Sequence, residues 1–166
     1  MNKENLAKLK DKLLTVSSEE FDMGQFRRGR EKKEEMNNPP CGTVACALGW
    51  APTIPGLEMS DNEAKNSGWH SYCERVFGIE AHGHSPEQWD FLFDGNWADF
   101  DNTPLGAAKR IQYLLNGGED NIPYNIECLL DGSDGEGDYD DDPNYIKEDD
   151  MDRLYDLIRE YKKIKL

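Results

Sequence analysis

The sequence predicts an all-α fold: a compact single-domain helical bundle of about six helices, with a mobile acidic loop before the last helix. Three observations predict it. Apolar residues recur at three- and four-residue spacing in several stretches, as they do on the buried face of a helix. A hydroxyl residue followed by proline precedes two of those stretches, which is typical of a helix start. No convincing alternation of apolar and polar residues occurs anywhere, so no strand is predicted.

The opening helix is predicted from four apolar residues that share one face: Leu6, Leu9, Leu13 and Val16. Ser17-Ser18 end this helix, and residues 19–26 are predicted to form one more helical turn through Phe21, Met23 and Phe26. Residues 27–35 are basic and then acidic without an apolar period. We expect a solvated loop or helix end there.

Residues 41–51 form an uncharged run of small side chains with two thiols and one indole. Pro39-Pro40 force an extended approach, so a helix is predicted to begin at Cys41. In that helix Gly42, Ala45 and Gly49 share one stripe and let another backbone come close. Pro52 and Pro55-Gly56 end it, and residues 56–66 are predicted to be a loop.

Three further helices are predicted before residue 118. The first is stopped by Gly78, the second starts at Ser85-Pro86, and the third starts at Thr103-Pro104 and stops at Gly117-Gly118. Residues 123–130 are short, and a helix is favoured there over a strand. The apolar faces of the three longer helices are Trp69, Tyr72, Cys73, Val76 and Phe77, then Trp89, Leu92, Phe93 and Trp97, and then Leu105, Ala108, Ile111 and Leu115.

Residues 131–143 are acidic and of low complexity, and they cannot bury enough apolar area to offset the entropy of ordering. We therefore expect a mobile loop between a helical core, residues 1–130, and a C-terminal helical segment, residues 144–166, that packs on it. The last helix is predicted from about Tyr145. Its inner face is predicted to hold Met151, Leu154, Tyr155, Ile158 and Tyr161.

The net charge of −15 repels nucleic acid and favours basic partners, so direct nucleic-acid binding is not expected. No apolar run is long enough to cross a membrane, and residues 1–12 do not resemble a secretory signal. The cysteines are too few for a disulfide framework, which favours a reduced, cytoplasmic setting. No cofactor is predicted.

Cys41 is one candidate catalytic residue. A thiol at a helix N-terminus has a lowered pKa and exposes a thiolate, as in cysteine hydrolases that use a histidine base and a carboxylate to orient it. His70, His82 or His84 would be the base, and Asp90 or Asp94 the orienting group. The alternative is that this thiol packs as ordinary core.

Zinc binding is a second candidate. Four potential ligands fall within residues 70–84: His70, Cys73, His82 and His84. Cys41 and Cys46 could add thiolates, although their spacing is at the edge of that seen in zinc sites. The alternative is ordinary packing of His70 and Cys73 beside Trp69 and Tyr72. No dedicated calcium site is predicted, because Tyr139 stands where an EF-hand loop starting at Asp134 needs glycine.

The acidic segment is the candidate partner-binding surface. Clustered carboxylates can imitate the phosphate spacing of a nucleic acid and occupy a basic groove on a partner protein, and neighbouring aromatic residues can anchor the contact. The alternative is that the charge only confers solubility. The candidate residues are Asp134, Glu136, Asp138, Tyr139, Asp140, Asp141, Asp142 and Tyr145.

The pattern Cys41-Gly-Thr-x-x-Cys46-x-x-Gly-Trp-Ala, the Trp89-x-x-Leu92-Phe93 stretch and Asp101-Asn-Thr-Pro104 resemble a family of small bacteriophage and bacterial proteins. The resemblance covers roughly residues 21–117. That family carries no established activity, so the resemblance implies no catalytic residues. It implies a phage-type protein acting in a bacterial cytoplasm, where small acidic phage proteins often bind host proteins, including defence nucleases.

The leading hypothesis is therefore a non-enzymatic acidic protein that binds a basic surface of a host protein, as a nucleic-acid mimic or an inhibitor of host defence. A cysteine-dependent hydrolase using Cys41, or a small zinc-binding protein, is the alternative. We expect the acidic segment, rather than the cysteine run, to be the working surface.

Overall fold

The computed structural model describes residues 1–25, 33–40, 42–66, 68–80, 87–118, 122, 126–131 and 148–166. In these ranges the chain is helical, and its only β-type pairing is an isolated parallel bridge between Phe21 and Ala45. The predicted all-α class is therefore confirmed. Buried apolar side chains from both ends of the described chain join one hydrophobic core, as expected of a single domain.

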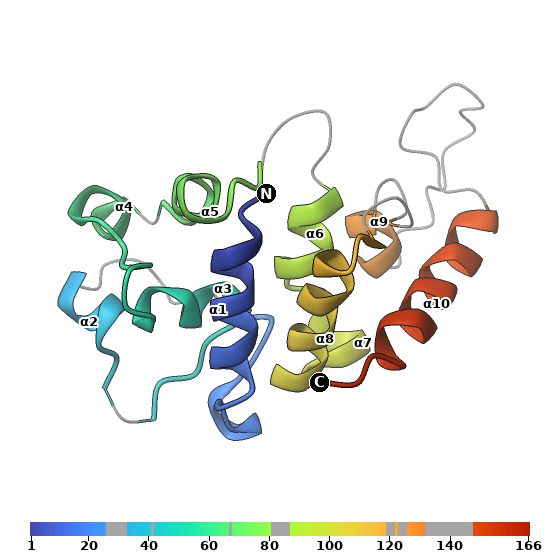
Figure 1. Cartoon of the computed structure of the whole chain (residues 1–166), viewed down its shortest axis with the longest axis horizontal. Helices are drawn as coiled ribbons and strands as arrows, with labels where there is room; N and C mark the ends of the chain where they lie inside the picture. The colour runs from blue at the N-terminus through green and yellow to red at the C-terminus, as the bar shows by residue number, and fades with distance from the viewer. Residues whose placement is uncertain are drawn as a thin grey trace.

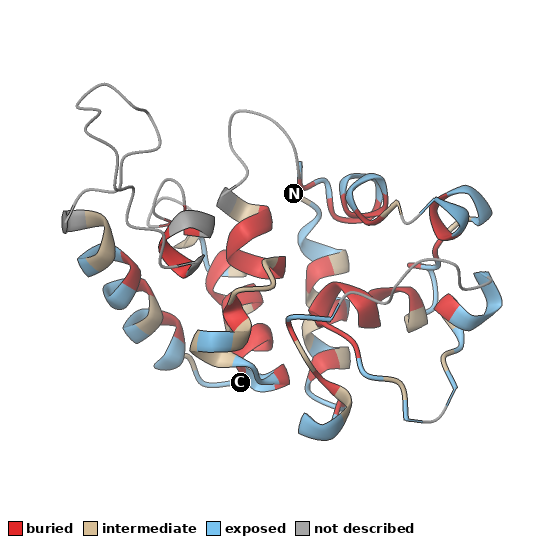
Figure 2. Cartoon of the chain, turned by 180° about the vertical axis from the view of Figure 1, so that it is seen from behind, coloured by how far each residue is buried: buried red, intermediate tan, exposed pale blue. Residues whose placement is uncertain are grey.

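The central pair of helices is α1 (Lys3–Leu13) and α8 (Pro104–Leu115), which pack along each other. Figure 1 shows one group of elements on each side of this pair. One group holds α2 (Lys33–Asn37), α3 (Ala47–Trp50), α4 (Asp61–Lys65) and α5 (Trp69–Phe77). The other holds α6 (Glu87–Phe93), α7 (Trp97–Asp101), α9 (Ile126–Asp131) and α10 (Glu148–Lys162). The buried residues face the interior of both groups (Figure 2).

The helices with clear apolar periods form as predicted. Leu6, Leu9 and Leu13 are fully buried on α1, and the predicted face of α5 is buried throughout. Gly78 ends α5 with φ +63°, a left-handed conformation that glycine adopts without strain. Thr103 caps α8, because its hydroxyl accepts a hydrogen bond from the Gly106 N–H at 2.9 Å. Leu105, predicted on the inner face, is instead half exposed.

The predicted helix over residues 41–51 is wrong in its first half. Cys41 lies outside the described residues, Gly42 has φ +84°, and the chain runs extended to Cys46 before α3 begins at Ala47. The backbone hydrogen bonds of this stretch go to another segment: Ala45 N–H donates to the Glu20 carbonyl at 3.2 Å, and Cys46 N–H donates to the Gln25 carbonyl at 2.9 Å. Ala45 and Cys46 therefore lie against a neighbouring extended chain, while α3 packs on α1 and α6.

Three other boundaries differ from the prediction. Residues 56–66 are not a loop throughout, because α4 occupies Asp61–Lys65. Residues 19–25 do not form the predicted helical turn, because the only helical part is a short 3-10 turn, Ser18–Glu20. The backbone is extended at Phe21, and the side chains of Phe21 and Met23 are buried. Phe26 lies outside the described residues. The helix predicted up to Trp97 divides, since Asp94 N–H still bonds back to Asp90 but Trp97 opens α7.

The C-terminal helix α10 packs on α8 and α9. Leu154, Leu157 and Tyr161 are its buried residues, and Met151 and Ile158 are partly buried. Tyr155, predicted on the inner face, is 49% exposed, because Leu157 takes the inward position. The predicted mobile loop, residues 131–143, lies outside the described residues except for Asp131 at the end of α9.

Candidate functional site

Most of the sequence-predicted site residues lie outside the described part of the chain. They are Cys41, His82 and His84 of the catalytic and zinc hypotheses, and Asp134, Glu136, Asp138, Tyr139, Asp140, Asp141, Asp142 and Tyr145 of the acidic surface. His70, Cys73, Asp90 and Asp94 are described, so their surroundings can be given.

His70 and Cys73 share α5 but lie in different environments. His70 is exposed, and its ring meets Trp89 edge-on with the ring centroids 4.7 Å apart. Cys73 is fully buried, and burial raises the pKa of its thiol, so Cys73 remains a protonated core residue near neutral pH. Among the described residues, no three His, Cys, Asp or Glu side chains are close enough together to hold a metal ion.

Asp90 and Asp94 belong to α6 and the bend that follows it. Asp90 is buried, and its backbone carbonyl accepts a hydrogen bond from the Trp97 indole N–H at 2.9 Å. The Asp94 carboxylate accepts a hydrogen bond from the Asn96 N–H at 2.6 Å. This contact is typical of an Asx turn. Together with the indole hydrogen bond, it holds α7 in its position relative to α6.

A polar network that the sequence interpretation missed surrounds α4. Ser60 accepts a hydrogen bond from the Glu63 N–H at 3.3 Å, and Glu63 accepts one from the Ser60 N–H at 2.8 Å. This reciprocal pair is a capping box, and it starts a helix of five residues. The signal was visible in the sequence as Ser60-x-x-Glu63.

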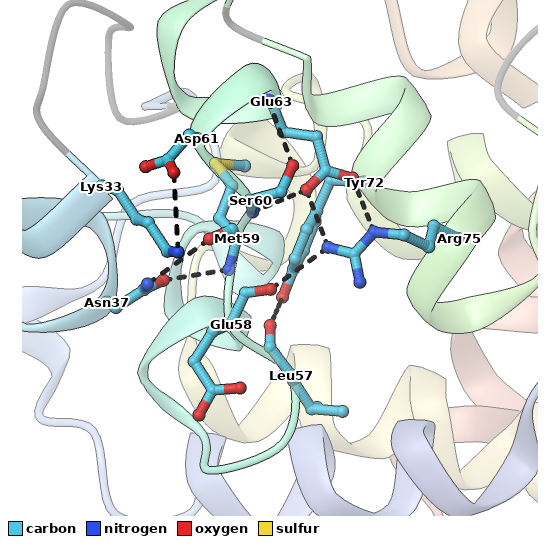
Figure 3. A network of polar contacts seen from close by, with 10 residues as sticks. All are labelled: Lys33, Asn37, Leu57, Glu58, Met59, Ser60, Asp61, Glu63, Tyr72 and Arg75. Carbon is cyan, nitrogen blue, oxygen red and sulfur yellow. Dashed lines mark hydrogen bonds and ion pairs between the residues drawn. The ribbon is translucent and has the colours of Figure 1, made fainter.

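Arg75 of α5 closes this network onto α4 (Figure 3). Its Nε and Nη2 donate to the two carboxylate oxygens of Glu63 at 2.8 and 2.7 Å, and Nη2 also donates to the Glu58 carbonyl at 3.1 Å. Burial alone would raise the pKa of Glu63, but the hydrogen bonds from Arg75 and Ser60 and the charge of Arg75 outweigh it and lower the pKa to about 2. Glu63 is therefore ionised near neutral pH, with hydrogen-bond partners on both carboxylate oxygens.

Two more contacts hold the loop before α4. The Tyr72 hydroxyl donates to the Leu57 carbonyl at 2.6 Å, and Asn37 exchanges two hydrogen bonds with the Met59 backbone. Burial raises the pKa of Tyr72, so its hydroxyl remains a donor. The whole set shown in Figure 3 joins α2, α4 and α5, and its chemistry is that of a structural clamp.

A further buried charged residue, Arg110, lies in the central helix α8. Its side chain is fully buried, and its guanidinium carbon lies 4.2 Å from the centroid of the Trp97 ring and 5.9 Å from that of Tyr161. Among the described residues, no group meets its three guanidinium nitrogens in hydrogen-bonding geometry. Burial lowers the pKa of Arg110, while the Tyr161 hydroxyl and the Asp101 carboxylate favour its charged form. Arginine nonetheless stays protonated.

Asp101 connects this arginine to α10. Its carboxylate accepts hydrogen bonds from the Thr103 hydroxyl at 2.7 Å and from the Tyr161 hydroxyl at 3.2 Å. It lies directly over Gly106, where a Cβ would collide with it. The arrangement is a cation held on aromatic faces with a carboxylate nearby.

The outer face of α10 is the third charged region. Its first half carries Asp150 and Asp152, and the residues from Arg159 to Lys165 are mostly basic. Its ion pairs join residues three positions apart: Arg159 with Asp156 at 2.8 Å, both exposed, and Arg153 with Asp150 at 3.2 Å, where the Asp150 side chain is 21% exposed. Exposed pairs of this kind contribute little to stability, so this face keeps its charges available.

No family model, curated protein or solved structure matches this chain. The resemblance to small phage proteins therefore stays a prediction from the sequence. In the part of the chain that the structure describes, no helix is both long enough and apolar enough to span a bilayer.

Proposed function

We propose that this chain is an acidic interaction protein that binds a basic surface of another protein. The observation that carries the proposal is where the charge lies. Residues 131–152 hold eleven Asp and Glu residues and a single lysine, so these 22 residues carry ten of the fifteen net negative charges. Because the charge is concentrated and not spread evenly, it can complement a basic patch of similar extent.

The described end of this acidic segment supports the proposal. Asp150 and Asp152 lie in the first turns of α10, and Asp152 and the nearby Tyr155 are exposed. Acidic side chains at a helix start are favoured by the helix dipole, so the carboxylates do not weaken the fold. An exposed tyrosine beside them is the kind of side chain that anchors protein interfaces.

The two other charged regions do not compete for this role. The carboxylate of Glu63 is 8% exposed and fully occupied by Arg75 and Ser60, and Arg110 is buried. Neither can reach a partner without unfolding its surroundings. Asp152, at the described end of the acidic segment, is exposed and so can reach a partner.

The finer part of the proposal concerns the partner. Carboxylates spaced along a chain can occupy a groove built for phosphates, so a nucleic-acid-binding protein is the partner class that the charge favours. The resemblance to small phage proteins favours a host protein in a bacterial cytoplasm, including a defence nuclease. In this proposal the carboxylates steer the encounter and the tyrosines hold the complex.

The test is capture of proteins from a bacterial lysate at two salt concentrations, with the intact chain and with a variant lacking residues 131–142. We expect specific captured proteins at about 50 mM salt, with capture falling at least about ten-fold at 500 mM because exposed charges are screened. The deletion should cause a similar loss at low salt. Tight capture that survives high salt, or that survives the deletion, would contradict the proposal.

A further inference from the structure

The outer face of α10 carries a stripe of charges that is complementary to the same stripe on a second, antiparallel copy of the helix. Asp152, Tyr155 and Arg159 are spaced by three and four residues, so they fall on one line along the helix. All three are exposed, and Tyr155 in the middle is 49% exposed. A negative charge therefore stands one turn before the tyrosine, and a positive charge one turn after it.

This order makes the stripe self-complementary in an antiparallel arrangement. When a second copy of α10 lies antiparallel to the first, Tyr155 meets Tyr155 of the second copy at the twofold axis. Asp152 then lies opposite Arg159 of the second copy, and Arg159 lies opposite Asp152 of the second copy. We propose that the chain forms a twofold homodimer through α10 in this register.

The geometry of the molecule leaves room for the second copy. α10 packs on α8 and α9 through its buried side, and it lies at the edge of the molecule in both overall views (Figures 1 and 2). The opposite side, which carries the stripe, is exposed. A twofold contact of this kind is isologous and closes on itself, so it produces a dimer and no filament.

The exposed ion pairs on α10 do not prevent this exchange. Arg159 is paired with Asp156 on its own helix, and the two side chains are 68% and 64% exposed. Such an exposed pair contributes little, so Arg159 can turn to Asp152 of the second copy at small cost. Lys162 and Lys163 are exposed without an ion-pair partner among the described residues, and they extend the basic end.

The dimer should be weak. A helix of 15 residues is about 22 Å long, so a pair of such helices buries less than the roughly 1,600 Å² of a standard stable interface. Each copy also carries a net charge of −15, which opposes association. We therefore expect a monomer–dimer equilibrium that depends on protein concentration at physiological ionic strength.

Charge reversal tests the register with purified protein alone. Sedimentation equilibrium over about 10 μM to 1 mM protein should show a dimer for the native chain, and Asp152→Arg and Arg159→Asp should each weaken it at least about ten-fold by placing like charges opposite each other. Mixing the two single variants should restore a dimer, since one then offers only Arg and the other only Asp. The double variant Asp152→Arg/Arg159→Asp should also dimerise.

Asp99→Arg is the matched control, because Asp99 is an exposed carboxylate on α7 outside the stripe. It changes the net charge as Asp152→Arg does and should leave the dimer intact. A native chain that is monomeric at every concentration would overturn the proposal, as would a dimer that the single reversals leave unchanged or that neither the mixture nor the double variant restores. The lysate capture tests residues 131–142, which lie outside the α10 stripe, so the two experiments can fail independently.

Discussion

The α4–α5 region and the outer face of α10 use the same side-chain types in opposite ways. At α4–α5, Arg75 holds both carboxylate oxygens of Glu63, whose side chain is 8% exposed. On α10, Arg159 holds Asp156 with both side chains more than half exposed. Breaking a pair that contains one buried charge leaves that charge without a partner and is costly, whereas an exposed pair costs little to rearrange and is available to a partner.

The largest effect is expected from Glu63→Gln. This change removes the charge that Arg75 pairs with and weakens the capping box of α4. Because Arg75 is 49% exposed and water can solvate it, the loss should be about 2 kcal/mol in the free energy of unfolding, below the cost of leaving a fully buried charge unpaired. Urea unfolding measures it, with Arg159→Gln as the control for an exposed pair. The control should change stability by about 0.5 kcal/mol or less; equal losses in both variants would break the comparison.

Acid should remove the same stabilisation without a mutation. The pKa of Glu63 is lowered from 4.5 to about 2 on folding, so the contribution of its charge is fully present above pH 4.5 and is lost as the pH falls towards 2. Many other carboxylates titrate in this window, so the informative quantity is the stability difference between the native chain and Glu63→Gln. It should be constant from pH 7 to 5 and shrink below pH 4.5. A difference that stays constant down to pH 3 would contradict the assigned pKa.

Arg110 sharpens the comparison because it is buried and, in the described part of the chain, lacks the hydrogen bonds that Glu63 has. Replacing a buried charge with an apolar side chain of similar volume is often neutral or stabilising. Arg110→Met keeps much of the packing on Trp97 and should change the free energy of unfolding by less than about 1 kcal/mol, in either direction. Calorimetric or urea unfolding measures the change. A loss larger than that of Glu63→Gln would mean that the guanidinium is better partnered than its geometry indicates.

Helices with an apolar period and a cap could be predicted from the sequence. α1, α5 and α8 each present buried residues at three- and four-residue spacing, with the expected ends at Gly78 and Thr103. These signals are local, so they need no knowledge of what packs against the helix.

The elements that the sequence did not predict depend on their neighbours. The small residues of 42–46 have no period, and only the hydrogen bonds to residues 20 and 25 decide that they run extended. Arg110 is usually an exposed residue type, although it falls on the buried line of Ala107, Ile111 and Leu114 in α8. The apolar line of α8 therefore marks position 110 as buried whatever its residue type. The acidic site residues are a charge pattern, which gives their position along the chain but not what they contact.

In the proposed function, the acidic segment, and not the overall negative charge, is the surface that binds the partner. Two variants with equal net charge test it most directly. One converts Asp138, Asp140, Asp141 and Asp142 to Asn. The other converts Glu19, Glu34 and Glu74 to Gln and Asp99 to Asn, all exposed carboxylates elsewhere.

Capture from a bacterial lysate at low salt should be lost for the first variant and kept for the second. In urea unfolding, both variants should have the same free energy of unfolding as the native chain within about 0.5 kcal/mol. Equal capture by the two variants, or an equal loss in both, would show that the position of the charge does not matter and would contradict the account.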